Sequence, residues 1–195
     1  LGGLRMTRLL VKIATYCLWA ILFSLPLYLF AQEQCGESAD ADVVMMLDKT
    51  GSVNSSELAL EKAAAKTLLN FFLAADIVRP RVAIGTFNVT AGADARIEPN
   101  GSLTDIYGNE NPASGLYLVA DSVCCSTGST NLGDAINVAQ AEIVARAHPA
   151  AEHYIILISD GIPNEPGGGG TGCSDGYWRT YAVNAATAAK QAGTR

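Results

Sequence analysis

Side chains that carry oxygen follow an apolar run early in the chain. The run Val43–Leu47 ends in Asp48, and hydroxyl residues follow at Thr50 and Ser52. A run this short and this apolar is typical of a buried strand in a parallel sheet. The turn after such a strand lies at the carboxyl edge of the sheet, where open α/β folds bind ligands. One carboxylate and two hydroxyls on a single turn are hard oxygen ligands, so this turn is a candidate site for a Mg²⁺-like ion.

Two distant segments carry residues of the same kind. Thr130 lies in the polar run Gly128–Asp134, and Asp160 closely follows a second apolar run, Tyr154–Ile158. Each of these residues, taken singly, is explained equally well as part of a turn or a helix cap. The three segments together form a far more specific pattern than Asp48 and its two hydroxyl neighbours alone.

In order and spacing, the three segments resemble the von Willebrand factor type A (vWA) domain family. That family has a metal-ion-dependent adhesion site with Asp-x-Ser-x-Ser after the first strand, a Thr in a middle loop and an Asp after a later strand. The resemblance covers residues 42–195 and assigns the metal to Asp48, Thr50, Ser52, Thr130 and Asp160. Thr50 stands where the family usually has Ser, and it keeps the hydroxyl group.

The resemblance also implies a function. A site built mainly from neutral hydroxyls leaves the charge of a bound Mg²⁺ or Mn²⁺ largely uncancelled, so the ion keeps affinity for one more anionic oxygen. The implied partner is a protein that offers an Asp or Glu carboxylate. The chain is then a metal-dependent adhesion module and not an enzyme.

A second resemblance comes from a different class of protein. Asp48-Lys49-Thr50-Gly51 also resembles the phosphorylation motif of P-type ATPases, in which an aspartate of a haloacid-dehalogenase-like fold acts as the nucleophile. Three features count against this alternative. Ser52 stands where that family has Thr, no lysine lies between Lys66 and Lys190, and the carboxylate pair of the family's hinge segment is missing.

Charge and composition limit the possible partners. The 195 residues are 49% hydrophobic and 16% charged, which suits one globular domain behind an apolar leader. All 19 acidic residues follow Ala31, but only ten of the 13 basic residues do, so this part of the chain has a formal charge of −9. A surface this acidic would repel phosphate groups, which argues against binding to nucleic acid.

The amino-terminal segment is typical of an export signal. Arg5, Arg8 and Lys12 precede an apolar run from Ile13 to Ala31. Residues 1–31 are therefore either a signal peptide, cleaved after Ala31, or a membrane anchor, and residues 32–41 are a polar linker. Both possibilities place the domain that follows, residues 42–195, outside the cytoplasm, either secreted or held at the membrane.

Strands alternate with helices after the linker. We expect strands at 43–48, 81–87, 95–98 and 154–159, and helices that start after Asn54, at 116–123, after Thr130 or Asn131, and at 177–191. Asn54 with Glu57 forms a capping-box-like helix start. The pattern predicts a three-layer, doubly wound α/β domain with a mostly parallel sheet and helices on both faces. Because the vWA family continues beyond this point, the domain is expected to be incomplete at its carboxyl end.

Helical spacing also predicts which faces pack on the sheet. In the first helix the inward positions are expected to be Leu60, Ala64, Leu68, Phe71 and Phe72. In the helix after Thr130 they are expected to be Leu132, Ile136, Ala139, Ile143 and Ala147.

Four of the five cysteines follow the leader, in a setting that favours disulfides. Their spacing does not fit a zinc site. The resemblance places the loops that carry Cys124, Cys125 and Cys173 on the metal face of the domain. We therefore expect Cys173 to pair with Cys124 or with Cys125.

Overall fold

The computed structural model describes residues 40–74, 79–88, 95–108, 115–124, 128–161 and 175–195. The predicted leader, most of the predicted linker, Cys35, Cys125 and Cys173 lie outside these residues. Cys124 is exposed and carries a free thiol, so the structure does not form the predicted pair of Cys173 with Cys124. The alternative pair, Cys173 with Cys125, involves only residues outside the described ranges and stays a prediction. Within the described parts of the chain, no helix is long and apolar enough to cross a membrane.

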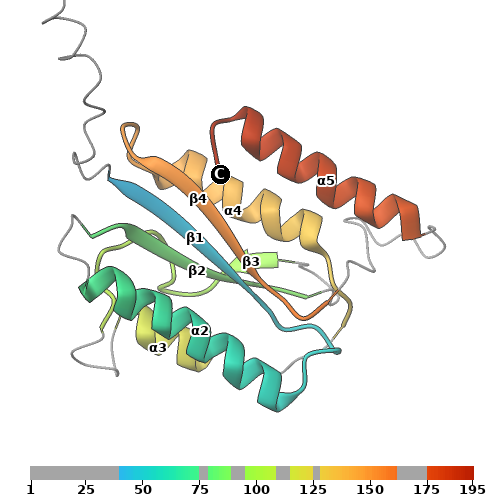
Figure 1. Cartoon of the computed structure of the whole chain (residues 1–195), viewed down its shortest axis with the longest axis horizontal. Helices are drawn as coiled ribbons and strands as arrows, with labels where there is room; N and C mark the ends of the chain where they lie inside the picture. The colour runs from blue at the N-terminus through green and yellow to red at the C-terminus, as the bar shows by residue number, and fades with distance from the viewer. Residues whose placement is uncertain (1–39, 75–78, 89–94, 109–114, 125–127, 162–174) are drawn as a thin grey trace, which may run out of the picture. The chain divides into compact units, whose positions relative to one another are not determined.

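Four strands form one mostly parallel sheet (Figure 1). They are β1 (Ala41–Asp48), β2 (Arg81–Phe87), β3 (Ala95–Ile97) and β4 (Glu152–Ile158), arranged in the order β3-β2-β1-β4. β1 pairs in parallel with both β2 and β4, and β3 pairs with β2 antiparallel. Leu47 is in register with Ile158, so the residues that follow β1 and β4 leave the sheet at the same edge.

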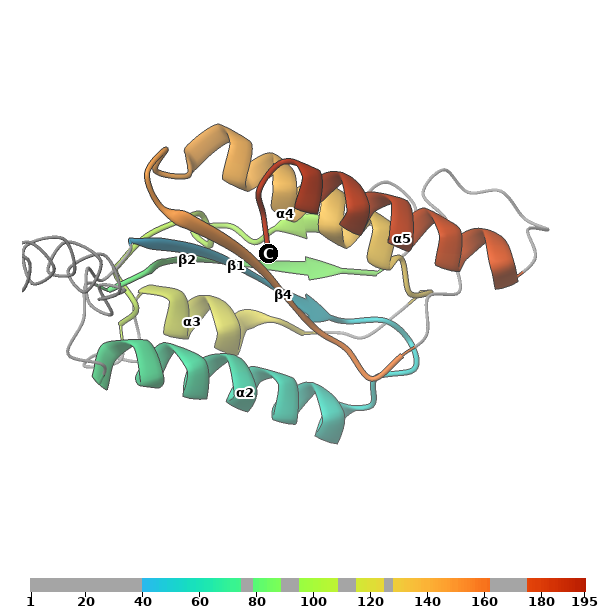
Figure 2. The ribbon, with the colours of Figure 1, turned by 45° about the horizontal axis from the view of Figure 1, so that its top comes forward.

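Helices cover both faces of this sheet (Figure 2). α2 (Ser55–Ala74) and α3 (Gly115–Ser122) lie on one face, and α4 (Leu132–Arg146) and α5 (Asp175–Gln191) lie on the other. Alternate residues of β1 enter the two cores, with Met45 among those packed with α2 and α3 and Met46 among those packed with α4. The predicted three-layer α/β fold is confirmed.

A reciprocal cap starts α2 shortly after the turn that carries the candidate metal ligands. The Asn54 Oδ1 atom accepts hydrogen bonds from the backbone N–H groups of Ser56 (2.9 Å) and Glu57 (3.1 Å). The Glu57 carboxylate accepts one from the Asn54 N–H at 2.7 Å. This confirms the predicted capping-box-like start, which satisfies three N–H groups that the helix itself leaves without partners.

The predicted inward face of α2 is wrong. Leu60 and Phe71 are 69% and 65% exposed, and Ala64 is exposed as well. The residues buried against the sheet are instead Leu58, Glu61, Ala65 and Leu69, with Leu68 and Phe72 partly buried beside them. Apolar residues lie on nearly every side of this helix, and the face that packs includes a carboxyl group. The predicted inward face of α4 is confirmed. Ile136, Ala139 and Ile143 are buried. Leu132 and Ala147 are partly buried and pack against the core cluster that contains Ala139 and Ile143.

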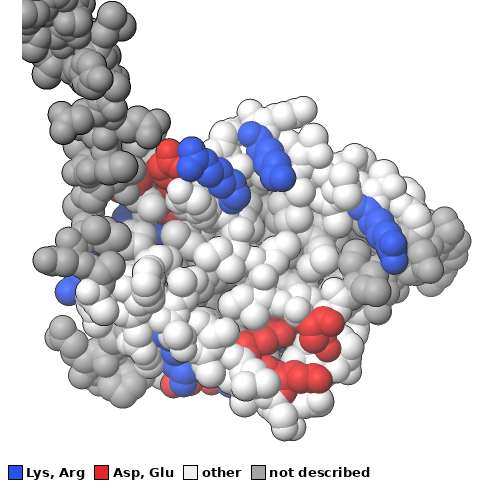
Figure 3. All heavy atoms as spheres, in the orientation of Figure 1, with Lys and Arg blue, Asp and Glu red and all other residues white. Residues whose placement is uncertain are grey.

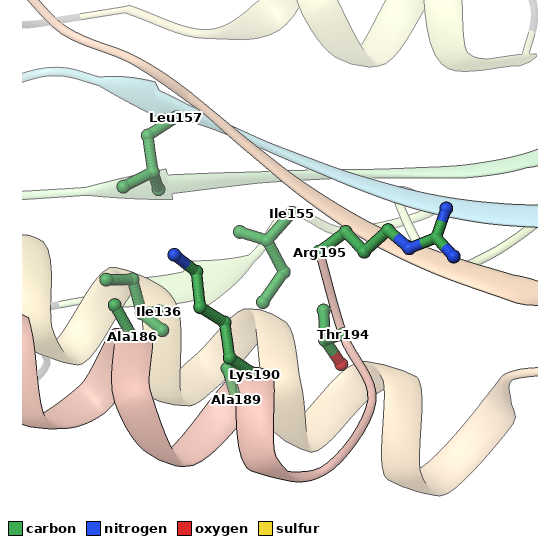
Figure 4. A pocket seen from close by; sticks show the side chains of 8 residues that line it. All are labelled: Ile136, Ile155, Leu157, Ala186, Ala189, Lys190, Thr194 and Arg195. Carbon is green, nitrogen blue, oxygen red and sulfur yellow. The ribbon is translucent and has the colours of Figure 1, made fainter.

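An apolar groove of about 150 Å³ lies between α4, α5 and the edge of β4 (Figure 4). Ile136, Ile155 and Leu157 line it, together with Ala186, Ala189, Lys190, Thr194 and Arg195. At one end of the groove the backbone of Arg195 pairs with β4, donating to the His153 carbonyl (2.8 Å) and accepting from the Ile155 N–H (2.9 Å). None of the five predicted metal ligands lines this groove.

Candidate metal site

The fold brings the three predicted segments together at the carboxyl edge of the sheet. β1 and β4 are neighbours, so the turns that begin at Asp48 and at Ser159 lie side by side. The loop before α4 joins them through a hydrogen bond from the Gly51 N–H to the Gly128 carbonyl (2.9 Å). The Lys49 N–H bonds to the Phe87 carbonyl (3.1 Å), which fixes the first turn to β2 as well.

Side-chain oxygens from the three segments form a connected set. The Thr50 and Ser52 hydroxyls are 3.0 Å apart, and the Thr130 hydroxyl lies 3.2 Å from that of Thr50. The Ser52 hydroxyl bonds to the Asp160 carboxylate at 3.3 Å. Asp48 joins through its Oδ1 atom, which accepts from the Thr50 N–H at 2.8 Å. The structure therefore brings together all five residues that the sequence predicts.

The five residues differ in their exposure to solvent. Asp48 and Thr50 are fully buried and Thr130 is 1% exposed, whereas Ser52 and Asp160 are exposed. The set thus has a buried floor and an open rim. A ligand held here would be anchored by rigid backbone elements and would still be accessible from the surface.

The spacing of the oxygens fits a small divalent cation. Around an octahedral Mg²⁺ with ligands at 2.0–2.1 Å, neighbouring oxygens are about 3 Å apart. The hydroxyl contacts at 3.0 and 3.2 Å are close to that value. Gly161 borders the same space, since a Cβ atom added there would lie 3.5 Å from the Thr130 hydroxyl and 3.7 Å from that of Ser52. Among the described residues, no group of three or more His, Cys, Asp or Glu side chains is placed to hold a metal.

Burial disfavours the charge on Asp48. It raises the pKa of this carboxyl, and the nearby Asp160 charge adds to the effect. Hydrogen bonds from Ser159 and Thr50 stabilise the ionised form and so lower the pKa of Asp48, but the net pKa remains raised. A cation near Asp48 would favour the ionised carboxylate, so proton release and cation binding are expected to be linked here.

Sequence reasoning missed two residues that contact the site. The Ser159 hydroxyl donates to the Asp48 Oδ2 atom at 2.6 Å. Glu61 of α2 is 7% exposed, and its Oε2 atom has no hydrogen-bond partner among the described residues. Burial, followed by the charges of Asp48 and Asp160, raises the pKa of Glu61 to about 8. The available signals were weak: a Ser directly before Asp160, and one acidic residue at helical spacing from Leu58 and Ala65.

The site lies within a patch of negative charge. Figure 3 shows acidic side chains gathered on the surface beside the start of α2. Asp48, Asp160 and Glu57 are the carboxylates whose charges act on Glu61. Such a concentration of negative charge favours a cation over an anion.

The Thr130 loop is held in place by α4 and α5. The Asn131 side chain caps α4 by accepting from the Asp134 N–H (3.0 Å), and it donates to the Asp134 carboxylate (2.8 Å). The Tyr181 hydroxyl of α5 donates to the same carboxylate at 2.5 Å. Gly133 permits this contact, because a Cβ atom there would lie 2.1 Å from the Tyr181 ring. The packing of α5 on the first turn of α4 therefore supports the backbone next to Thr130.

Comparisons with known proteins agree with this arrangement. The family model of the von Willebrand factor type A domain matches residues 42–194. A search of curated protein sequences finds no match. Among solved structures, the SpRpn10 VWA domain superposes with a TM-score of 0.56 at 15% identity, over 80% of this chain and 71% of that chain.

Two further structures share the fold over parts of longer chains. Manganese-loaded TRAP protein from Plasmodium vivax gives a TM-score of 0.55 at 18% identity, over 81% of this chain and 56% of that chain. The pilus adhesin SpaC from Lactobacillus rhamnosus GG gives a TM-score of 0.52 at 18% identity, over 66% of this chain and 15% of that chain. At these identities the likeness shows the fold alone.

The family match also bears on the second resemblance. It includes Asp48-Lys49-Thr50-Gly51, the segment that resembles P-type ATPases, and assigns that segment to a different fold. Fold, order of motifs and family match agree, and the chain belongs to the von Willebrand factor type A domain family.

Proposed function

We propose that this chain is a divalent-metal-dependent protein-binding module, exported or anchored at a membrane, and not an enzyme. The observation that carries the proposal is the contact of the Thr50, Ser52 and Thr130 hydroxyls at 3.0–3.2 Å, with Asp160 beside them and Asp48 beneath. These three hydroxyls come from two segments 80 residues apart, so their convergence is a property of the fold.

The residues of the site have separate roles in this proposal. The buried Thr50 and Thr130 hydroxyls would hold Mg²⁺ or Mn²⁺ without neutralising it, while the two aspartates provide the negative charge. Ser52 and Asp160 form the exposed rim, so a partner approaches from their side. The bound cation supplies a positive centre that attracts an anionic oxygen, and we propose an Asp or Glu side chain of a partner protein as its source.

The comparisons and the composition support this proposal. The TRAP protein is manganese-loaded and SpaC is a pilus adhesin, and both contain the same fold. The apolar run at 13–31 with its basic flank supports export or anchoring. The acidic balance of the residues that follow supports a protein partner over nucleic acid.

Metal should stabilise the folded chain by mass action. At a free Mg²⁺ or Mn²⁺ concentration about a hundred times the dissociation constant, we expect the free energy of unfolding to rise by ~2.7 kcal/mol. For a domain of this size that corresponds to a rise in melting temperature of roughly 5–10 °C. Thermal unfolding of the full chain in EDTA and in increasing Mg²⁺ or Mn²⁺ measures this directly.

The control is Asp105→Asn, which removes an exposed carboxylate outside the site. This variant should keep the full response to metal. A wild-type melting temperature that stays the same in EDTA, Mg²⁺ and Mn²⁺ would contradict the proposed function.

A further inference from the structure

The second oxygen of the Asp48 carboxylate has a partner from a distant part of the chain. Oδ1 is held locally by the Thr50 N–H two residues on, but Oδ2 accepts a hydrogen bond from Ser159, 111 residues away. The contact follows from strand register. Leu47 pairs with Ile158, so Asp48 and Ser159 are the next residues along the two neighbouring strands.

The Ser159 hydroxyl takes part in two hydrogen bonds at once. Its oxygen accepts from the Gly161 N–H at 3.1 Å, and its one proton is donated to Asp48 Oδ2 at 2.6 Å. When a cation holds Asp48 in its ionised form the carboxylate can only accept, so the Ser159 proton must point to it. Both Asp48 oxygens are then bonded, and the plane of the carboxylate is fixed.

The same two bonds also hold the third segment of the site. Asp160 lies between Ser159 and Gly161, so the turn that carries it is tied through one hydroxyl to the carboxylate at the end of β1. Gly161 is also close to Thr130 and Ser52, since a Cβ atom added at Gly161 would meet both of their hydroxyls within 3.7 Å. Loss of the Ser159 hydroxyl would free one Asp48 oxygen and one end of this turn together.

We propose that Ser159 is a positioning residue of the cation site, which orients Asp48 and the Asp160-Gly161 turn instead of serving as one of the five ligands. This role rests on the proposed function, because it concerns the same site. Groups that orient metal ligands typically change metal affinity 10–100-fold when they are removed. Ser159→Ala should therefore weaken Mn²⁺ binding by roughly that factor.

The test is Mn²⁺ binding to the full chain, measured by isothermal titration calorimetry, for the wild type, Ser159→Ala and Ser159→Thr. Thr keeps the hydroxyl and should hold the affinity within about threefold of the wild type. Thr187→Ala, which removes an exposed hydroxyl on α5 bonded to the Val183 carbonyl, is the matched control and should bind Mn²⁺ like the wild type. Thermal unfolding in EDTA distinguishes loss of metal affinity from loss of folding. If Ser159 positions the ligands, Ser159→Ala binds Mn²⁺ more weakly even at temperatures well below its melting temperature, where the variant is folded.

The outcomes distinguish this role from the proposed function. If the wild type binds Mn²⁺ and Ser159→Ala binds it equally tightly, the role of Ser159 is wrong and the proposed function stands. If Ser159→Thr loses as much affinity as Ser159→Ala, the hydroxyl is not what matters and the role is again wrong. If the wild type binds no Mn²⁺ at all, both proposals fall.

Discussion

Glu61→Gln should make the metal-free protein more stable at pH 8, by on the order of 2–4 kcal/mol. The reason is the raised pKa of this carboxyl, about 8 in the folded protein against 4.5 for the unperturbed group. The side chain is buried between α2 and the end of β1, and its Oε2 atom has no partner among the described residues. Gln has nearly the same shape and does not titrate, so it avoids the free-energy cost of either ionising this buried carboxyl or keeping it protonated when the unfolded chain would release the proton.

The effect should depend on pH in a defined direction. Below about pH 4.5 Glu61 is protonated in both the folded and the unfolded chain, so its raised pKa does not lower the free energy of unfolding. As the pH rises from 4.5 to 8, the unfolded chain loses this proton while the folded chain keeps it, so the wild type becomes progressively less stable. The gain from Glu61→Gln should therefore be near zero at pH 4.5 and reach its maximum near pH 8.

Urea unfolding of the full chain in EDTA, at several values between pH 4.5 and pH 8, measures this difference. Asp105→Asn is the control, because Asp105 is exposed and is not among the carboxylates whose charges act on Glu61. A stability gain for Glu61→Gln that is the same at all pH values would show that ionisation of Glu61 is not the cause.

Asp48→Asn should abolish the response to metal and leave the fold intact. The variant removes the buried negative charge while keeping a side chain that can bond to the Thr50 N–H and to the Ser159 hydroxyl. At a Mg²⁺ concentration that stabilises the wild type by ~2.7 kcal/mol, we expect no measurable stabilisation of the variant. In EDTA its free energy of unfolding should stay within about 1 kcal/mol of the wild-type value, because burial already disfavours the charge on Asp48.

Thermal unfolding with and without Mg²⁺ decides this prediction, and circular dichroism confirms that the variant is folded. Asp121→Asn, which removes an exposed carboxylate paired with Lys66, should respond to Mg²⁺ as the wild type does. A normal metal response in Asp48→Asn would place the binding site elsewhere on the protein.

Local patterns were sufficient to predict the layers of the fold. The apolar runs that became β1 and β4, the Asn54 cap and the inward face of α4 are each specified by residues close in sequence. The rotation of α2 about its own axis is not specified by residues close in sequence. Its apolar residues surround the helix, so several stripes are compatible with a 3.6-residue period, and only packing against β1 selects the one that contains Glu61.

The five candidate ligands were predictable for a different reason. Asp48, Thr50 and Ser52 lie within one turn, and the vWA resemblance supplied Thr130 and Asp160. Ser159 had no comparable signal, because its contact with Asp48 depends on which strands are neighbours and on their register. Glu61 depends in the same way on how α2 is rotated. Residues that act through another side chain are difficult to recognise in a single sequence, since their partners are distant along the chain.

The central claim is that Asp48, Thr50, Ser52, Thr130 and Asp160 form one divalent cation site. Anomalous diffraction from a crystal of the protein soaked in Mn²⁺ tests it most directly. The account predicts an anomalous peak within about 2.0–2.3 Å of the Thr50, Ser52 and Thr130 hydroxyl oxygens, with both aspartates beside it. A well-ordered site with no peak, or a strong peak at another place on the domain, would contradict it.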